Sequence, residues 1–367
     1  MTREEPLLSG LEQTVFRLRG LYQSYGYLQY QMSKFEEYDL YAQNKDFLVS
    51  DNVITFMDGG KLMALKPDVT LSIVRAIRPG SEGLEKVFYD ENVYRVAKGM
   101  SYFQEIRQTG LECIGPVDDY DVAEVVLLAA ESLRAISPRS VLVLSHLGAV
   151  SKALDRTKVS AEARESLLKC ISSKSLQGLE RVCAQSGADP EGAGLLRDLL
   201  SVSGENAAIL DALSRHECLY EELHALRALL SAMDAAGLGG MLRLDFSVLS
   251  DMNYYGGMVF QGFVSGVPGS VLSGGQYDKL IAKLGRKGGA IGFAVYLDQL
   301  ERLFPEEGND ADLVLLYDEI AAAETVLRAV RELTAQGLRV RVARQVPEEL
   351  RYGKLAKLVG SEVQILG

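Results

Sequence analysis

The clearest alternation of hydrophobic and polar residues lies between residues 86 and 115, in the stretch KVFYDENVYRVAKGMSYFQEIRQTGLECIG. Both arms are rich in β-branched and aromatic residues and Lys98–Ser101 contains a turn glycine, so the stretch is predicted to form two antiparallel strands. Because side chains two residues apart in a strand share a face, Gln108, Gly110 and Glu112 are expected to point the same way. A carboxylate on a covered face needs a partner, which leaves two interpretations: a solvated face, or a pocket for a small cationic ligand.

Hydrophobic residues spaced three and four apart predict helices over residues 8–25 and 118–136, and the second helix has an acidic first turn that suits its N-terminus. Residues 146–239 are mostly helical in pattern, with breaks at 187–194 and 201–205, and we interpret them as an inserted helical region. Further strands are predicted at 53–57, 62–65, 140–145 and 241–249.

The last part of the chain has a pattern of its own. Strands are predicted at 313–316, 338–343 and 363–366, separated by helices at 320–336 and 348–358. This order predicts a small βαβαβ lobe at 309–367, after a core of residues 1–308 that contains the helical insertion at about 146–240.

Composition narrows the functional classes. Of 367 residues 47% are hydrophobic and 24% charged, as in ordinary globular proteins, and 39 basic against 50 acidic residues give a net charge of −11 that repels nucleic-acid phosphates. No hydrophobic run could cross a bilayer and the N-terminus has no signal core, so we expect a cytoplasmic protein that binds neither membrane nor nucleic acid. The scattered cysteines and histidines predict no metal site, and no Walker or dinucleotide motif indicates a cofactor.

The hairpin also resembles a known family. An aromatic residue, Arg95, a loop and then QTGLE are similar to the second signature of class II aminoacyl-tRNA synthetases, in its histidyl-tRNA synthetase form. The stretches DMNYYGGMVFQGFV, SGGQYDKL and GGAIGFAVYLDQL extend the resemblance over nearly the whole chain. The resemblance implies an α+β fold, with a class II antiparallel sheet flanked by helices, and it likens the C-terminal lobe to the first half of the synthetase anticodon-binding domain.

The segment LKPDVT has two interpretations. Asp68 or Thr70 could simply cap the helix that follows. The segment also resembles the synthetase stretch in which an acidic residue and a threonine hold the α-amino group of histidine, with Asp68 in place of the more usual glutamate.

The resemblance implies that the amino-acid side of the synthetase site is kept. The matching positions, which imply a histidine-binding site, are Asp68, Thr70, Gln108, Glu112, Tyr254 and Tyr255. These residue types form a consistent set, because two carboxylates suit an ammonium and an imidazole N–H while aromatic rings supply hydrophobic walls.

The resemblance also implies that the ATP side is lost. Arg95 remains as a possible phosphate contact, and Arg302 lies almost one helical turn beyond the position of the ATP-clamping arginine. The synthetase residues replaced here are two arginines, two acidic residues and a glycine, at Ser250, Gln299, Asn253, Ala97 and Tyr296. Positioned arginines stabilise the phosphate charge during activation, so we expect no catalytic residues and no enzyme activity from this chain.

A chain that has a histidine pocket on an inactive synthetase core resembles the family of ATP phosphoribosyltransferase regulatory subunits. That family implies a short catalytic subunit as partner, a homodimer within a hetero-octamer, and L-histidine as the inhibiting effector of the first step of histidine biosynthesis. Two alternatives stay open at this point, a divergent histidyl-tRNA synthetase and a free-standing scaffold protein.

Overall fold

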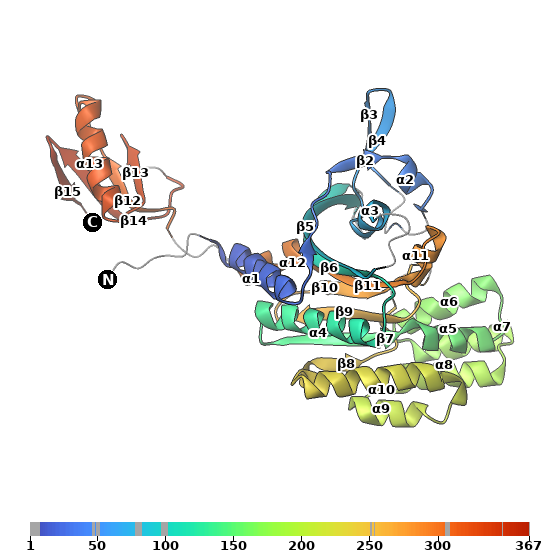
Figure 1. Ribbon diagram of the computed structural model, residues 1–367. Helices are drawn as coiled ribbons and strands as arrows, with labels where there is room; N and C mark the ends of the chain where they lie inside the picture. Colours follow the sequence, from blue (N-terminus) through green and yellow to red (C-terminus); the bar gives the residue numbers. More distant parts are fainter. Residues whose placement is uncertain are drawn as a thin grey trace. The chain divides into compact units, whose positions relative to one another are not determined.

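The computed structural model describes residues 8–45, 48, 52–77, 83–96, 102–249, 252, 254–304, 309–346 and 348–366. The chain divides into two compact units, a larger one over Gly10–Leu303 and a smaller one that consists mainly of Phe304–Gly367 (Figure 1). No helix among the described residues is both long enough and apolar enough to span a membrane.

An eight-stranded sheet is the centre of the larger unit, with the strand order β1-β5-β6-β11-β10-β9-β7-β8. Its strands are β1 (Leu28–Gln29), β5 (Glu85–Val96), β6 (Phe103–Gly115), β7 (Ser140–His146), β8 (Leu242–Leu244), β9 (Met258–Val264), β10 (Leu272–Gln276) and β11 (Gly289–Tyr296). The outermost pairs, β1 with β5 and β7 with β8, are parallel, and all other pairs are antiparallel. The predicted hairpin is confirmed as β5 and β6, whereas the strand predicted at 241–249 shortens to β8 because Asp245 forms a turn with Ser247.

Two helices cover one face of this sheet, α1 (Gly10–Ser24) and α4 (Asp119–Ile136) (Figure 1). The predicted acidic start of α4 is an Asp118 capping box, in which the Asp118 carboxylate accepts hydrogen bonds from the first-turn amides. Tyr22 of α1 is buried, its ring packs against the rings of Phe88 and Phe293, and its hydroxyl is 3.0 Å from Ser132 Oγ. Leu111 and Cys113, the alternate residues of β6, are buried toward the same helices.

The opposite face carries a smaller, three-stranded sheet and several short helices (Figure 1). The order is β2-β4-β3, and the predicted hairpin at 53–65 is confirmed with its turn at Gly59 and Gly60, both at positive φ. The elements are β2 (Phe35–Glu37), β3 (Thr55–Asp58), β4 (Lys61–Leu65), α2 (Asp39–Ala42), α3 (Thr70–Ala76), α11 (Asp278–Lys283), α12 (Leu297–Leu300) and η4 (Glu301–Leu303).

The helical insertion follows β7 and returns to the sheet at β8 (Figure 1). It consists of α5 (Leu147–Arg156), α6 (Ala161–Ser172), α7 (Leu176–Ser186), α8 (Pro190–Ser201), α9 (Asn206–Leu213), η2 (Glu217–Leu219), α10 (Tyr220–Ala235) and η3 (Gly239–Met241). Both predicted breaks occur, although α8 already begins at Pro190, where a proline at the first helical position costs no hydrogen bond. The α+β fold class with this insertion is confirmed.

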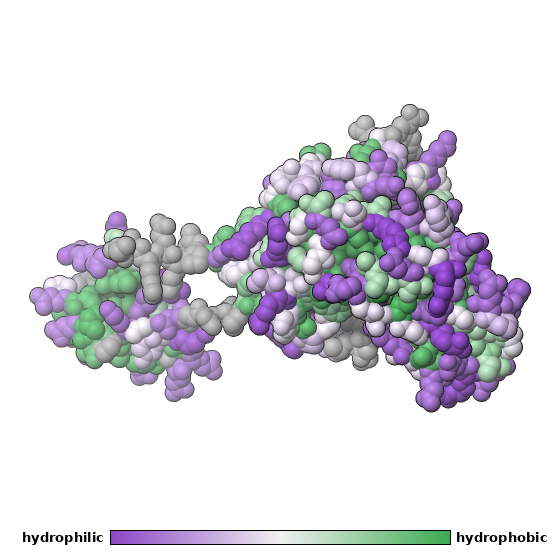
Figure 2. Space-filling view, turned by 90° about the horizontal axis from the view of Figure 1, so that it is seen from below, coloured by the Kyte–Doolittle hydropathy of each residue, from purple (hydrophilic) through white to green (hydrophobic). Residues whose placement is uncertain are grey.

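The smaller unit is a four-stranded sheet of order β13-β12-β14-β15 with one helix, α13 (Ala323–Ala335). Its strands are β12 (Ala311–Leu316), β13 (Val340–Ala343), β14 (Tyr352–Val359) and β15 (Glu362–Ile365). In Figure 2 hydrophobic residues gather in the middle of its visible face, between hydrophilic residues at the edges.

The helix predicted at 348–358 is wrong, because residues 352–359 form the strand β14. Leu355 and Leu358 fit a helical spacing, but Ala356 and Leu358 also alternate, and these two are the buried residues of the strand. β14 pairs with β12 on one side and, through a turn at Gly360, with β15 on the other. The predicted βαβαβ lobe is therefore a βαβββ lobe.

Candidate functional site

The candidate site lies on the face of the large sheet opposite α1 and α4, and the residues at the centre of this face are small. Gln108 and Glu112 of β6 are in register with Tyr296 and Gly292 of β11. Between and beside them on the same face lie the small residues Gly110, Ala294, Ser273 and Gly275. Larger side chains from other elements can therefore approach the strands closely here.

Glu112 is the buried acid of this face, with 2% of its surface exposed. Its Oε1 accepts a hydrogen bond from Thr70 Oγ1 at 2.7 Å, and its Oε2 accepts one from the Tyr277 hydroxyl at 2.5 Å. Burial raises the pKa of Glu112 to about 8, against the lowering effect of these two donors, and nearby Asp68 raises it further. The carboxyl is therefore mostly protonated at neutral pH and ionises in weakly alkaline solution. Because an ionised carboxylate has about four acceptor sites, two donors leave it able to accept a ligand.

Two glycines make this arrangement possible. A Cβ atom on Gly292 would lie 1.8 Å from Glu112 Oε2 and 2.5 Å from the Leu111 carbonyl oxygen. A Cβ atom on Gly275 would lie 2.9 Å from the Tyr255 ring. The glycines thus give room to the carboxylate and to the aromatic ring that lies over the sheet.

Asp68 and Thr70 lie at the start of α3 and point toward the same face. The Asp68 carboxylate accepts the Leu71 amide at 2.8 Å, so the capping interpretation holds for this residue. Burial raises the pKa of Asp68, while the Leu71 amide and the Arg95 guanidinium lower it. Capping uses one carboxylate oxygen and does not exclude a ligand at the other.

The turn that carries Asp68 is held by a fully buried lysine. Lys66 has no exposed surface, and its Nζ lies 2.7 Å from Glu91 Oε2. Its carbonyl oxygen also accepts the Tyr94 amide at 2.9 Å, so backbone and side chain are both fixed to β5. Burial lowers the pKa of Lys66, and the Glu91 carboxylate opposes this. Since a buried charge needs a partner, the Lys66–Glu91 pair fixes the position of the α3 N-terminus.

Tyrosines surround Glu112. The ring centroids of Tyr254 and Tyr255 are 4.6 Å apart, and those of Tyr254 and Tyr277 are 5.6 Å apart. Tyr89 is buried beside Gly110, where its hydroxyl lies 2.7 Å from the position of an added Cβ. Burial raises the pKa of all four phenols, so they stay protonated and act as hydrogen-bond donors and hydrophobic walls.

Two polar side chains of the face lack a side-chain partner in the described part of the chain. Gln108 is 5% exposed, yet its amide makes no hydrogen bond with a described residue. Arg95, near the end of β5, forms no ion pair there, although its charge lowers the pKa of Asp68 and of Tyr255. An amide and a guanidinium without such partners among the described residues suit the polar groups of an amino acid, including a carboxylate.

The arrangement offers no metal centre among the described residues, where no three His, Cys, Asp or Glu side chains are grouped around a common point. The four cysteines are free thiols. The described side chains of the site offer hydrogen bonding and charge pairing.

The end of the face where the synthetase signature has a glycine is occupied by Tyr296. Its hydroxyl is 2.6 Å from Ser273 Oγ, which directs the ring across β10. Gln299 of α12 is exposed, as is Arg302 of η4. Asp298 accepts the Arg107 amide at 3.0 Å and so attaches α12 to β6. Three of the replaced positions, Ser250, Asn253 and Ala97, lie outside the described residues.

The structure brings together all six residues singled out in the sequence. Thr70 contacts Glu112 directly, the Tyr254 and Tyr255 rings are tilted against each other, and Asp68 lies close enough to raise the pKa of Glu112 and of Tyr255. Gln108 lies on the same face of β6, four residues before Glu112. Sequence reasoning missed Tyr277, the second donor to Glu112, which lies 165 residues away in the chain. The run of small residues in SGGQY just before it was the available signal.

Comparisons with known proteins agree with this fold. The family model described as Histidyl-tRNA synthetase matches residues 5–300, so the chain belongs to the histidyl-tRNA synthetase family of class II-like proteins. An ATP phosphoribosyltransferase regulatory subunit from Desulfitobacterium hafniense is 30% identical over 77% of this chain and 74% of its own. One from Clostridium kluyveri is 28% identical over 80% and 78%. Within the family, the chain belongs with the ATP phosphoribosyltransferase regulatory subunits, and the resemblance found in the sequence is confirmed.

Solved structures share the fold. A Bacillus halodurans protein described as an ATP phosphoribosyltransferase regulatory subunit/histidyl-tRNA synthetase has a TM-score of 0.75 at 23% identity and covers 96% of this chain and 94% of its own. A chain of the ATP phosphoribosyl transferase (HisG:HisZ) complex from Thermotoga maritima has a TM-score of 0.62 at 17% identity and covers 78% and 97%. At these identities the likeness concerns the fold alone.

Proposed function

We propose that this chain binds histidine on the face described above and thereby regulates a short-form ATP phosphoribosyltransferase catalytic subunit. The observation that carries the proposal is the contrast between the two ends of the face. The amino-acid end keeps a buried acid with its two donors, Thr70 and Tyr277. The other end carries the Tyr296 ring and an exposed Gln299 where the synthetase signature has a glycine and an arginine. Such a site suits an amino-acid effector, and Gln299 does not supply the positive charge that an arginine gives to adenylation.

Each part of histidine has a counterpart in the site. Asp68 and Thr70 at the start of α3 suit the α-amino group, and the Arg95 guanidinium suits the carboxylate. Glu112 suits an imidazole N–H, and the neighbouring Tyr254 and Tyr255 rings supply hydrophobic walls. Ligand pockets of this kind combine hydrophobic walls with a few placed polar groups.

The partner follows from the family. The Thermotoga maritima structure is a HisG:HisZ complex of ATP phosphoribosyl transferase, and by analogy we propose a catalytic subunit as partner, in a hetero-octamer. A homodimer through the N-terminal elements is supported by exposed hydrophobic residues there, since Leu28 on the edge strand β1 is 72% exposed and Phe16 on α1 is 52% exposed.

The absence of synthetase chemistry is directly testable. With ATP, histidine and magnesium, the purified chain is expected to show no exchange of pyrophosphate into ATP, because losing even one phosphate-stabilising group costs about 10²- to 10³-fold. A histidyl-tRNA synthetase in the same assay is the positive control. Exchange at a rate close to that of the control would contradict a regulatory role and favour a divergent synthetase.

A further inference from the structure

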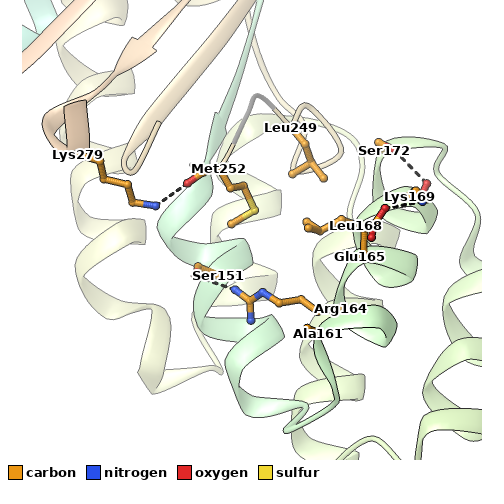
Figure 3. A pocket seen from close by; sticks show the side chains of 10 residues that line it. All are labelled: Ser151, Ala161, Arg164, Glu165, Leu168, Lys169, Ser172, Leu249, Met252 and Lys279. Carbon is orange, nitrogen blue, oxygen red and sulfur yellow. Dashed lines mark hydrogen bonds and ion pairs between the residues drawn. The ribbon is translucent and has the colours of Figure 1, made fainter. Parts of the chain in front are cut away.

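A groove lies between the helical insertion and the sheet core, apart from the histidine face. Its volume is about 580 Å³, and it is bounded by α5, α6, α11 and the residues Leu249 and Met252 (Figure 3). Leu168 on α6 together with Leu249 and Met252 on the core side form a hydrophobic lining, and all three are only half-buried. When a partner covers these half-buried hydrophobic residues, their removal from water favours binding.

The polar part of the groove is mainly cationic. Among the described residues, Arg164, Lys169 and Lys279 line it, together with the carboxylate of Glu165. Lys169 pairs with Glu165 at 2.7 Å, and Arg164 reaches Ser151 at 3.3 Å and pairs with Asp155 outside the groove (Figure 3).

Lys279 differs from the other two cations. Its Nζ donates to the Met252 carbonyl oxygen at 2.5 Å and pairs with no carboxylate among the described residues. In a chain with a net charge of −11, a lysine in a groove that has no carboxylate partner among the described residues favours an acidic partner by charge complementarity.

The groove shares two segments with the proposed histidine site. Met252 precedes Tyr254 by two residues, and Lys279 follows Tyr277 by two residues. Tyr277 donates to Glu112, and its neighbour Gln276 accepts the Gly256 amide at 3.1 Å and the Met258 amide at 2.7 Å, which ties the two segments together. A protein segment in the groove would therefore contact residues whose neighbours line the histidine site.

We propose that the groove is a docking surface for an acidic segment of the catalytic partner, in which a hydrophobic side chain stands next to a carboxylate. The hydrophobic side chain would cover Leu168, Leu249 and Met252, and the carboxylate would pair with Lys279. This inference rests on the proposed function, because it assigns a surface to the partner that the function requires.

The test uses the full chain and a short-form catalytic subunit, with binding measured by surface plasmon resonance. Lys279→Glu and Leu168→Asp are each expected to weaken binding about tenfold or more, and the Lys279 variant should also lose part of the salt dependence. The matched controls are Arg181→Glu and Leu176→Asp on α7 of the same insertion, where Arg181 is exposed and Leu176 is 37% exposed. Both controls should bind within about twofold of the parent, since surface substitutions elsewhere have small effects.

The possible results distinguish a wrong docking surface from a wrong proposed function. If the parent chain does not bind the catalytic subunit, the proposed function fails together with the docking surface. If the parent binds and the Lys279 and Leu168 variants bind equally well, the docking surface is wrong and the function stands. Light scattering of the chain alone distinguishes a second copy as occupant, because a change of mass in Lys279→Glu, an exposed substitution, would assign the groove to self-association and overturn the proposal.

Discussion

Replacing Glu112 by glutamine is expected to weaken histidine binding about ten- to hundredfold at about pH 9, because a hydrogen bond to a charged group is worth about 1.5–3 kcal/mol. The pKa of Glu112 is raised to about 8. At about pH 6, two units below this pKa, ionising the carboxyl therefore costs about 2.7 kcal/mol of free energy. The affinity of the parent should therefore fall with pH below 8, and the difference between parent and variant should shrink. Histidine's own titration affects both proteins alike, so the ratio of affinities from calorimetry reports Glu112.

In the absence of histidine, the melting temperature of the same variant is expected to depend on pH differently from that of the parent. The folded-state pKa of Glu112, about 8, lies above the ordinary value of 4.5. Its contribution to stability is thus fully present below about pH 4.5 and is lost as pH rises through 8. Glutamine does not titrate, so Glu112→Gln should melt like the parent at about pH 5 and at a higher temperature than the parent at about pH 8. A variant that melts several degrees lower at every pH but binds histidine like the parent would show that Glu112 is only a structural partner.

Adding a single methyl group at Gly292 is expected to abolish measurable histidine binding. The Cβ atom of Gly292→Ala would lie 1.8 Å from Glu112 Oε2 and 2.5 Å from the Leu111 carbonyl oxygen, and β6 cannot move away without breaking its pairing with β11. Overpacking of this kind costs about 1–3 kcal/mol of folding free energy. Calorimetry and thermal melting together measure both effects.

Gly194→Ala on α8 is the matched control, because a Cβ atom there meets no other atom within 4 Å. Alanine in a helix interior is about 0.5–1 kcal/mol more stable than glycine, so this variant should melt at or slightly above the parent temperature and bind histidine normally. If Gly292→Ala behaves like this control, the Glu112 carboxylate is not held against β11 as described.

The local pattern of hydrophobic and polar residues was sufficient to predict most helices and strands of the larger unit. The period-two pattern of 86–115 and the helical spacing of 8–25 each identify an element whose hydrophobic face is buried against the other, as the ring contact between Tyr22 and Phe88 shows. The same pattern was insufficient at 348–358, because Leu355, Ala356 and Leu358 fit both a helical and a strand spacing. In the folded chain this stretch pairs with β12 and is therefore a strand.

The site shows the same limit. Asp68, Thr70 and Glu112 could be named because each lies in a recognisable segment, and their assembly follows once α3 packs on β6. Tyr277 was missed, because the small residues of SGGQY mark its segment but not its contact with Glu112, which is made only in the folded chain. The register of β11 against β6, which makes Gly292 indispensable, is likewise a property of the folded sheet.

The central claim is that histidine acts on the catalytic subunit through this chain. The most direct measurement is the rate of a short-form ATP phosphoribosyltransferase catalytic subunit, alone, with this chain, and with this chain and increasing histidine. At about pH 9, where Glu112 is ionised, the account predicts that the chain raises the rate, that histidine lowers it again with a coupling of about 1–3 kcal/mol, and that a complex with Glu112→Gln needs about ten- to hundredfold more histidine. A rate that the chain does not change, or histidine inhibition that is the same with the parent and with Glu112→Gln, would contradict it.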